Sequence, residues 1–523
     1  CLRRGGRRVE LVHLGVQWLE DPTYSVARAY DGAQIRAIGL SLYWHYQSYD
    51  SIEVARALKA AHPEAFVFLG GLTAGYFARQ ILEGFDFIDG VLVGHAEGSV
   101  QHLVDTLAEG ADLGQVAHLV FRGPDGAVLE SDMLRGPKRF SVPPLDELVY
   151  GDLSVMQNPR TYSSSFGFPL AYGREFSPAE NRQMLTMGRA FFPLFVGRGC
   201  AWTCTFCGGN RDTLRKVNGT SKLAWRSPEA VVRDIRFAMD YGYKTMALCF
   251  DPTPQKDDYY CTLFEHIRRE KLDCDFYFEC WGLPTPKFVA DFKRTFPSPE
   301  SYVAISPDAG NDAVRLKNKQ PYYTSVELFE TLDRLEQTEV TFDVFYTIAL
   351  PGETAETARD SQRQINTIAA KYKRARRLMT WSVQLEPGSP QFERPESFNM
   401  ITDRHNFMDF YAAHGGDRAD TYSSLGFKIE GFFGDERDLG GIADFEKHLQ
   451  HLKCMEFCFL GRDPRFWSTP EAGRAHCFER QTMLAKKRGI APPSRPIGLG
   501  WMYGDALAEE RQKRPERARH SWV

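Results

Sequence analysis

The segment VGRGCAWTCTFCGGN at residues 196–210 contains three cysteines within eight residues and is the strongest guide to the fold. Cys200, Cys204 and Cys207 form a C-x3-C-x2-C array directly after a short apolar run. Glycines stand on both sides of the array, and they permit the tight turns that a loop around a metal group requires. The spacing therefore predicts one metal site in this loop.

The type of metal site follows from the ligands and their number. Thiolates are soft ligands that suit iron–sulfur clusters, and three of them can bind three irons of a [4Fe–4S] cluster while the fourth iron stays open for a substrate. Zinc is the alternative, but structural zinc sites usually combine two C-x2-C pairs or Cys and His pairs. No second pair stands near the array, and Cys454 and Cys458 lie in a predicted helix at the spacing of core residues. The array favours an iron–sulfur cluster.

The overall composition indicates a globular chain of several domains. With 523 residues, 43% of them hydrophobic and 25% charged, the chain is expected to form two or three domains. A formal net charge of −4 gives no electrostatic reason to expect nucleic acid or a membrane as a partner. The eleven cysteines are too scattered for a disulfide framework, so we expect a reducing, cytoplasmic environment.

The first part of the chain alternates short apolar runs with amphipathic segments, which predicts a doubly wound parallel sheet with helices on both faces. The expected strands are 9–16, 35–44, 65–71, 88–94 and 117–123. The expected helices lie around 25–33, 51–62, 76–84 and 99–109. The basic start before the first strand faintly resembles a signal peptide, but Glu10 and His13 interrupt the apolar run. In such sheets, ligands bind at the carboxyl ends of the strands.

A second series of strand–helix units begins near residue 190 and predicts a partial (βα)6 barrel. Its expected strands are 193–197, 244–250, 275–281, 301–306, 341–349 and 377–385. Its expected helices are 228–240, 257–270, 286–294, 324–337 and 354–372. We therefore expect an α/β chain in four parts: a doubly wound domain at 1–135, a linker or wrapping segment at 136–189, the barrel at 190–400, and a mainly helical region at 401–523 that caps the barrel and contacts substrate.

A cysteine array at the top of the first strand of a six-unit barrel resembles the radical S-adenosylmethionine (SAM) superfamily. The resemblance implies a [4Fe–4S] cluster on Cys200, Cys204 and Cys207 whose free iron binds the amino and carboxylate groups of SAM. It also implies contacts to SAM from Phe206 at the adenine, Asp251 at the methionine amine, and Glu279 and Ser306 at the sulfonium and ribose. Ordinary strand-end hydrogen bonding is the alternative for Glu279 and Ser306.

Two further fragments, TIALPGET (347–354) and QLEPGSPQFE (384–393), resemble signatures of the cobalamin-dependent branch of this superfamily. Members of that branch carry an N-terminal doubly wound domain for the corrinoid, which residues 8–130 resemble. The resemblance implies that the corrinoid tail binds at three strand ends, through Ser41, Gly70, Gly71, Gly94, Glu97 and Gly98.

The lower face of cobalt is where the sequence departs from many cobalamin domains. Those domains donate a histidine from a D-x-H-x-x-G loop after the first strand, but the matching stretch EDPTYSVARAYDG (20–32) has no histidine. Arg28 is the candidate to lie under the corrin ring, because a guanidinium offers no lone pair to cobalt; a solvated helix residue is the alternative. His45 is the rival lower-face ligand, although aromatic packing also explains its surroundings.

The resemblance predicts a C-methyltransferase that moves a methyl group from SAM through methylcobalamin to a carbon atom of a small aromatic substrate. Arg28, Glu279 and Tyr346 are the candidate catalytic residues, and aromatic side chains at the barrel mouth suit a planar molecule. Glu229 is a candidate ligand of the fourth iron, although its position in RSPEAVV also suits the first turn of a helix. Within the family, the pattern most resembles the tryptophan methyltransferases of thiopeptide antibiotic biosynthesis, which act at carbon 2 of indole.

Other functions stay open from the sequence. A cobalamin-dependent enzyme of this kind could instead catalyse a rearrangement or cyclisation, or methylate another natural-product precursor. A corrinoid sensor or carrier would need no cysteine triad, and an RNA methylthiotransferase would need a second triad and a basic nucleic-acid module, which the sequence lacks. An electron donor for the cobalamin or the cluster is an expected partner, whereas nucleic acid and membrane are not.

Overall fold

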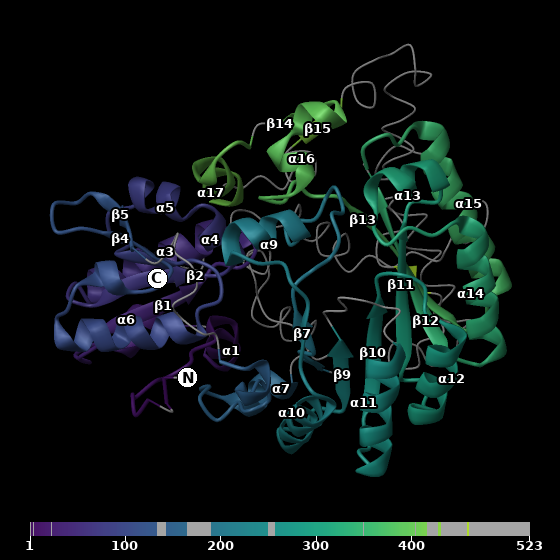
Figure 1. Cartoon of the computed structure of the whole chain (residues 1–523), viewed down its shortest axis with the longest axis horizontal. Coiled ribbons are helices and arrows are strands. Elements are labelled where there is room, and N and C mark those ends of the chain that lie inside the picture. The colour runs from purple at the N-terminus through teal and green to yellow at the C-terminus, as the bar shows by residue number, and fades with distance from the viewer. Residues whose placement is uncertain are drawn as a thin grey trace.

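The described part of the chain contains two large sheets that lie side by side, each covered by helices, and two sheets of two strands (Figure 1). The computed structural model describes residues 2–3, 5–21, 23–132, 143–164, 190–248, 257–348, 350–402, 404–415, 427–429 and 458–459. Over these residues, we find no helix with the length and apolar character needed to cross a membrane.

The N-terminal sheet has five strands in the order β1-β2-β3-β4-β5. Its strands are β1 (Ala37–Ser41), β2 (Phe66–Gly70), β3 (Gly90–Leu92), β4 (Leu119–Arg122) and β5 (Val128–Glu130). The first three are parallel, as expected, while β4 and β5 run antiparallel to their neighbours. The strand predicted at 117–123 therefore exists but has the opposite direction, because an apolar run predicts burial and not strand direction.

Helices cover both faces of this sheet, which confirms that part of the prediction. Val67 and Leu69 of β2 point to one face and pack with α3 (Ser48–Ala61) and the shorter helices α4 (Leu72–Tyr76) and α5 (Ala78–Gly84). Phe68 of β2 points to the other face and packs with α6 (Glu97–Glu109). This alternation is the period-2 pattern of a strand buried on both sides.

The strand predicted at 9–16 is wrong. Helix α1 (Leu14–Glu20) begins inside that range, and the ring of His13 caps it by accepting a hydrogen bond from the backbone N–H of Val16 at 3.3 Å. Only Leu11 forms an isolated bridge, to Met156. His13 thus serves a helix start, whereas Glu10 accepts hydrogen bonds from Tyr30 and Gln157. The short helix α2 (Val26–Ala29) lies inside the helix expected at 25–33.

The helix α17 (Phe407–Gly415) follows the barrel in sequence but packs on the N-terminal half. Phe407 and Phe410 are fully buried in the core of that half, and the Tyr411 hydroxyl donates a hydrogen bond to Glu53 at 2.6 Å. Helix α17, in the region expected to cap the barrel, therefore covers α3 instead. Most of 401–523, and with it the predicted helical content, lies outside the described residues.

The second half is a partial (βα)6 barrel, as predicted. Its sheet has seven strands in the order β16-β13-β12-β11-β10-β9-β6. The parallel strands are β6 (Phe191–Pro193), β9 (Thr245–Leu248), β10 (Asp275–Cys280), β11 (Tyr302–Asp308), β12 (Thr341–Ile348) and β13 (Ala375–Ser382), and β16 (Cys458–Phe459) is an antiparallel edge. The intervening helices are α10 (Pro228–Asp240), α11 (Asp257–Arg269), α12 (Pro286–Thr295), α13 (Asp312–Asn318), α14 (Ser325–Gln337) and α15 (Ala355–Lys371).

A buried ion cluster lies inside the barrel near the amino ends of β12 and β13. Asp343 is fully buried and accepts hydrogen bonds from Nε of Arg376 at 3.0 Å and from Nε of Arg377 at 2.8 Å. The guanidinium of Arg376 also lies 3.3 Å from the centre of the Tyr302 ring. Burial acts to raise the pKa of Asp343, but the two guanidinium groups outweigh it and lower that pKa.

Replacing Asp343 with Asn should lower the free energy of unfolding by about 3–5 kcal/mol, because it leaves two buried guanidinium groups without their anion. A carboxyl whose pKa is lowered by folding stabilises the fold at pH above its unfolded pKa, and the effect is lost as pH falls through the folded value. The variant should therefore lose this acid dependence. Urea unfolding of the cofactor-free chain at several pH values measures both effects.

Asp258→Asn is the matched control, because Asp258 is 95% exposed and its ion pair with Lys287 lies at the surface. An equal loss of stability in both variants would contradict the structural role of the buried cluster.

Candidate functional site

The cysteine loop (residues 196–210) follows β6 and is shaped by close backbone packing. Its first residues form β7 (Gly197–Arg198), which pairs antiparallel with β8 (Ala224–Trp225). Gly199 has φ +93°, and a Cβ there would lie 2.3 Å from the carbonyl oxygen of Lys222. Only glycine fits at this position, immediately before Cys200.

Two segments distant in sequence hold the middle of the loop. The backbone N–H of Gln320 points at Sγ of Cys204 at 3.3 Å, and the hydroxyl of Thr205 donates to Asn318 at 2.7 Å. From the other side, the side-chain amide of Gln391 donates to the Thr205 hydroxyl at 3.1 Å. These contacts fix the loop between α13 and the segment that follows β13.

The end of the loop is fixed by the signature after β13. The side-chain amide of Asn210 donates to the carbonyl oxygens of Cys207 at 2.6 Å and Gly388 at 3.0 Å. The backbone N–H of Gly208 donates to Oε2 of Glu386 at 2.6 Å. A Cβ on Gly208 would lie 2.6 Å from the carbonyl oxygen of Pro387, so this signature packs directly on the cysteine loop.

Burial affects all three thiols of the cysteine loop in the same direction. Burial raises the pKa of Cys200, Cys204 and Cys207, and Cys204 raises the pKa of the other two further, because like charges repel. Over the described residues, no three His, Cys, Asp or Glu side chains surround a single ion position. A cubane cluster does not require that arrangement, since each thiolate binds a different iron. Three thiols on a glycine-flanked loop fit such a cluster.

A polar group lies at the barrel mouth beside the loop. Nζ of Lys319 is 2.8 Å from Oδ2 of Asp308, and the hydroxyl of Thr347 donates to Oδ1 of Asp308 at 2.9 Å. Burial raises the pKa of Glu279, while the ammonium of Lys319 lowers the pKa of both Glu279 and Cys204. One cation with two carboxylates next to a cysteine can bind a zwitterion. Of these residues, only Glu279 was expected from the sequence.

The carboxyl ends of β1, β2 and β3 align at one edge of the N-terminal sheet. Ser41 pairs with Gly70, and Gly70 pairs with Leu92. A Cβ on Gly70 would meet nothing within 4 Å, whereas Gly71, with φ +115°, lies against the backbone of Leu42. The edge therefore has open space above Gly70, as a ligand-binding strand end requires.

The other expected tail-binding residues are engaged with the barrel half. Gly94 has φ +81° and packs on the backbone of Val217 in α9 (Arg211–Asn218). Glu97, at the start of α6 and next to Gly98, forms an ion pair with Arg198 of the cysteine loop. These contacts join the two halves at the site itself.

The carboxyl edge of the N-terminal sheet faces the cysteine loop. Tyr43 follows β1, and its pKa is raised first by burial and then by the charges of Cys207 and Glu386. These interactions and the Glu97–Arg198 ion pair join this edge to the cysteine loop. Tyr43 and the neighbouring Trp44 are large aromatic side chains with 47% and 45% of their surface exposed.

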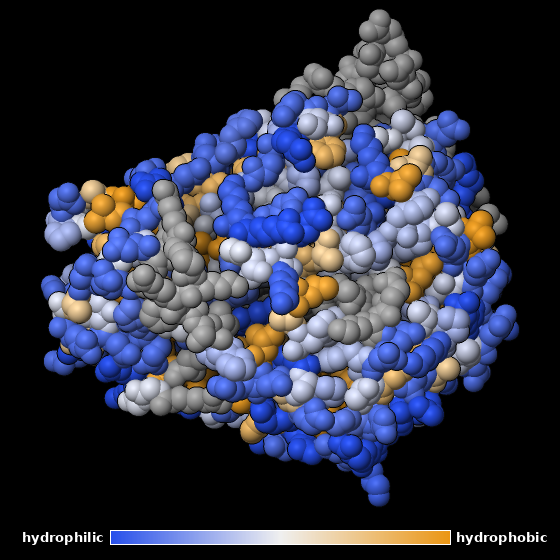
Figure 2. Space-filling view, in the orientation of Figure 1, coloured by the Kyte–Doolittle hydropathy of each residue, from blue (hydrophilic) through white to orange (hydrophobic). Residues whose placement is uncertain are grey.

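Helix α9 covers the joint between the halves and carries a polar outer surface. Asp212 and Arg215 are exposed, and Asp212 pairs with both Arg211 and Arg215. Figure 2 shows a hydrophilic band over this helix.

Glu229 lies away from the cysteine loop, where it was expected to bind the fourth iron. It is 65% exposed and lies 3.4 Å from His266 on the outer helix layer, as its alternative role in a helix start implied. Arg28 is exposed, and its described hydrogen bond goes to the carbonyl oxygen of Thr23 at 3.5 Å. Its expected position under the corrin ring stays a prediction.

Tyr346 points away from the barrel interior. It is fully buried between β12 and α15, and its hydroxyl donates to Gln364 at 3.0 Å. The neighbouring Thr347 points inward, since successive strand residues face opposite sides. Tyr346 therefore packs in the core and has no contact with the barrel mouth, which corrects its assignment as catalytic.

The structure describes all but one of the remaining expected residues. Ser306 lies on the inner face of β11, on the opposite side from Val303 and Ile305 in the outer core, and Phe206 packs partly buried against the barrel core. Asp251 lies outside the described residues. His45 is buried, with Nδ1 3.2 Å from Nε2 of His414 in α17.

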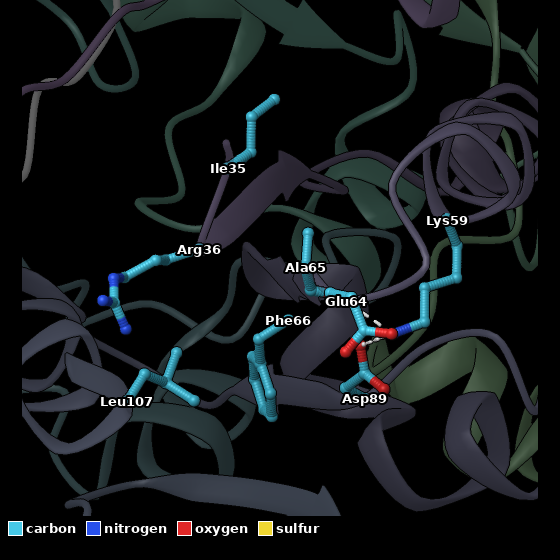
Figure 3. Close-up of a pocket in the computed structure, with 8 residues that line it drawn as sticks. All are labelled: Ile35, Arg36, Lys59, Glu64, Ala65, Phe66, Asp89 and Leu107. Atoms are coloured by element: carbon cyan, nitrogen blue, oxygen red, sulfur yellow. Dashed lines mark hydrogen bonds and ion pairs between the residues drawn. The ribbon is translucent and has the colours of Figure 1, made fainter. Parts of the chain in front are cut away.

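A surface pocket of about 370 Å³ lies at the opposite ends of β1, β2 and β3. Its lining residues are Ile35, Arg36, Lys59, Glu64, Ala65, Phe66, Asp89 and Leu107. Figure 3 shows Lys59 reaching toward Asp89, to which its ammonium is 2.8 Å distant, while Arg36 points away from this pair. The pocket is separated from the candidate site by the length of the strands.

The comparisons with known proteins define the class of the barrel. Residues 194–365 match the model of the radical SAM superfamily, so the chain carries a radical SAM domain. The match begins just before the cysteine loop and ends within α15.

The individual relatives are more distant. The chain is 27% identical over 207 residues to the hopanoid C-3 methylase of Methylococcus capsulatus, a match that covers 39% of this chain and only 33% of that protein. The fold of this chain is similar to that of the radical SAM methyltransferase TsrM from Kitasatospora setae, in a structure that has tryptophan substrate and a SAM analogue bound. The TM-score is 0.58 at 14% identity, and the match covers 98% of this chain and 94% of TsrM. The fold is also similar to that of the cobalamin-dependent radical enzyme OxsB with aqua-cobalamin bound, with a TM-score of 0.53, 11% identity, and coverage of 93% of this chain and 64% of OxsB.

Replacing Gly199 with Ala should abolish the loop geometry, because the new Cβ would collide with the backbone of Lys222. We expect iron bound per chain after anaerobic reconstitution to fall to less than half of the wild-type level. Gly219→Ala is the matched control, since Gly219 also has a positive φ, +68°, but has nothing within 4 Å of its Cβ position. Equal iron contents in both variants and the wild type would contradict this prediction.

Proposed function

We propose that the chain is a cobalamin-dependent radical SAM methyltransferase that transfers a methyl group from SAM to a carbon atom of a small aromatic substrate. The observation that carries the proposal is the ion pair between Glu97 and Arg198: it joins the edge of the N-terminal sheet where a corrinoid would bind to the three-cysteine loop of a radical SAM domain. A methyl carrier must have access to both the methyl donor and the acceptor, and this arrangement would hold the substrate between the corrin face and the barrel mouth.

The three cofactors are assigned to separate parts of the site. Cys200, Cys204 and Cys207 would hold the [4Fe–4S] cluster, and Ser41, Gly70 and Gly71 would contact the corrinoid. Cobalamin supplies a cobalt centre that accepts and donates a methyl group. The similarity in fold to TsrM and OxsB supports this assignment. An electron donor is part of the proposal, because cobalt and cluster chemistry of this kind starts from a reduced state.

The methionine part of SAM carries an ammonium and a carboxylate, and the polar group at the barrel mouth has the complementary charges. Lys319 would bind the carboxylate, while Glu279 and Asp251 would bind the ammonium or neighbouring atoms. Phe206 and Ser306 stay proposed contacts to the adenine and the ribose. The adjacent residue, Gln320, points its backbone N–H at Sγ of Cys204 at 3.3 Å, and this contact supports a place for the Lys319 cation close to the cluster.

For the substrate, we propose L-tryptophan with methylation at carbon 2 of the indole. The exposed rings of Tyr43 and Trp44 lie 5.0 Å apart at the proposed interface, and planar apolar groups bind well to such surfaces. A second candidate is a larger apolar molecule, which the partial match to a hopanoid C-3 methylase favours.

Incubation of the reconstituted enzyme with methyl-labelled SAM and tryptophan should give tryptophan labelled at carbon 2, detectable by mass spectrometry. Cys204→Ala should lose the label transfer together with bound iron, whereas Cys274→Ala, outside the loop, should retain both. In a parallel incubation with a hopanoid in place of tryptophan, label in the hopanoid and none in tryptophan would favour the second candidate. Turnover of SAM without label in any product would favour a rearrangement or cyclisation and contradict methyl transfer.

Lys319→Met should weaken SAM binding about tenfold or more, because it removes a charge-assisted hydrogen bond worth about 1.5–3 kcal/mol. Lys216→Met is the matched control, since Lys216 is 56% exposed and pairs with Glu393 on the surface. Calorimetric titration of SAM into the cluster-loaded chain measures both affinities, and an unchanged affinity in the Lys319 variant would remove Lys319 from the binding site.

A further inference from the structure

The three thiols of the cysteine loop have different charged neighbours. Cys204 lies near Lys319 and Asp308, whose charges form an ion pair and largely cancel. Cys200 lies near Arg211, whose side chain is 41% exposed and paired with Asp212. Cys207 has a carboxylate, Glu386, as its charged neighbour from outside the cysteine triad.

Glu386 is held at this position by the loop itself. Its Oε2 accepts the hydrogen bond from the backbone N–H of Gly208, the residue after Cys207, at 2.6 Å. It belongs to the segment that begins after β13, and Gly388 and Gln391 of the same segment bind the loop at Asn210 and Thr205. The carboxylate therefore cannot move away from Cys207 unless this packing is broken.

No cation in the described part of the chain is hydrogen-bonded to or paired with Glu386. Burial raises the pKa of its carboxyl, and the hydrogen bond from the Gly208 N–H offsets only part of that rise. Lys216, near the same segment, pairs with Glu393 instead, at 3.0 Å. A negative charge in a partly buried place is weakly screened, so it acts on any neighbouring redox group.

We propose that Glu386 is a positioning residue that lowers the reduction potential of the [4Fe–4S] cluster by holding one uncompensated negative charge beside Cys207. This inference rests on the proposed function, because it needs the cluster on the three cysteines. Adding an electron to the cluster increases its negative charge, and a fixed anion nearby makes that step less favourable. Charge and hydrogen bonding around the sulfurs are known determinants of cluster potentials.

The experiment is a redox titration of the reconstituted full-length protein, with a chemical reductant and the electron paramagnetic resonance signal of the reduced cluster as the readout. Glu386→Gln removes the charge but keeps an oxygen that can accept the Gly208 hydrogen bond. At a fixed solution potential, we expect the ratio of reduced to oxidised cluster to rise about tenfold, which for one electron is an upward shift of about 59 mV in midpoint potential.

Two variants make the interpretation specific. Glu386→Asp keeps the charge, and its midpoint should stay near the wild-type value. Glu393→Gln removes a carboxylate seven residues later in the same segment, which pairs with Lys216 and Tyr76, and its midpoint should also stay unchanged. Glu386→Asp also keeps the test decisive if Glu386→Gln does not retain a cluster. In that case, a tenfold rise in the ratio of reduced to oxidised cluster in Glu386→Asp, which keeps the charge, would overturn the charge-based account.

The outcomes separate this inference from the proposed function. A wild-type chain that binds no iron and sulfide after reconstitution would contradict the proposed function. A wild-type chain with a normal cluster, but equal midpoints for wild type and Glu386→Gln, would overturn the role of Glu386 alone. Equal shifts in the Glu386→Gln and Glu393→Gln variants would also overturn it.

Discussion

The structure depends on the fixation of a cysteine loop that has almost no regular structure of its own. Its backbone is held by Lys222 before the array, by Asn318 and Gln320 in the middle, and by the segment after β13 at the end. These partners come from different strand–helix units, so the loop acquires its shape only when the barrel has folded. Inside the barrel, the ion cluster at Asp343 links the side chains of β12 and β13.

The same loop joins the two halves of the molecule. Arg198, two residues before the first cysteine of the array, pairs with Glu97 and lies 3.2 Å from the Tyr150 hydroxyl, so it links the N-terminal sheet and the segment before the barrel to the loop. Phe392, in the segment after β13, packs against both hydrophobic cores. Because these contacts surround the cysteine loop, the carboxyl edge of the N-terminal sheet and the loop form one site.

The sequence predicted the elements whose signals are local. The barrel helices other than α13 were placed within a few residues, because residues such as Ser227, Thr285 and Thr324 cap their first turns and apolar faces continue from there. The cysteine array was found from its spacing. Lys319 and Glu386 were missed as site residues, because only the folded chain brings them to the loop. Glu386 stood within a recognised signature, but nothing local distinguishes a carboxylate beside a thiol from one in solvent.

The errors in the site have the same physical origin. Tyr346 and Thr347 are adjacent, and a shift of one residue in a strand exchanges the inner and outer faces, so an aromatic residue near a strand end was assigned to the wrong side. The buried carboxylates of the barrel differ in how their charges are neutralised, and this difference indicates which of them has a functional role. At Asp343, two guanidinium groups neutralise a buried carboxylate, and at Asp308 one ammonium does so. At Glu386 no described cation does, although burial opposes its charge. A carboxylate kept under that penalty beside a thiol is more readily explained by function than by stability, since an uncharged side chain would fill the same space at lower cost.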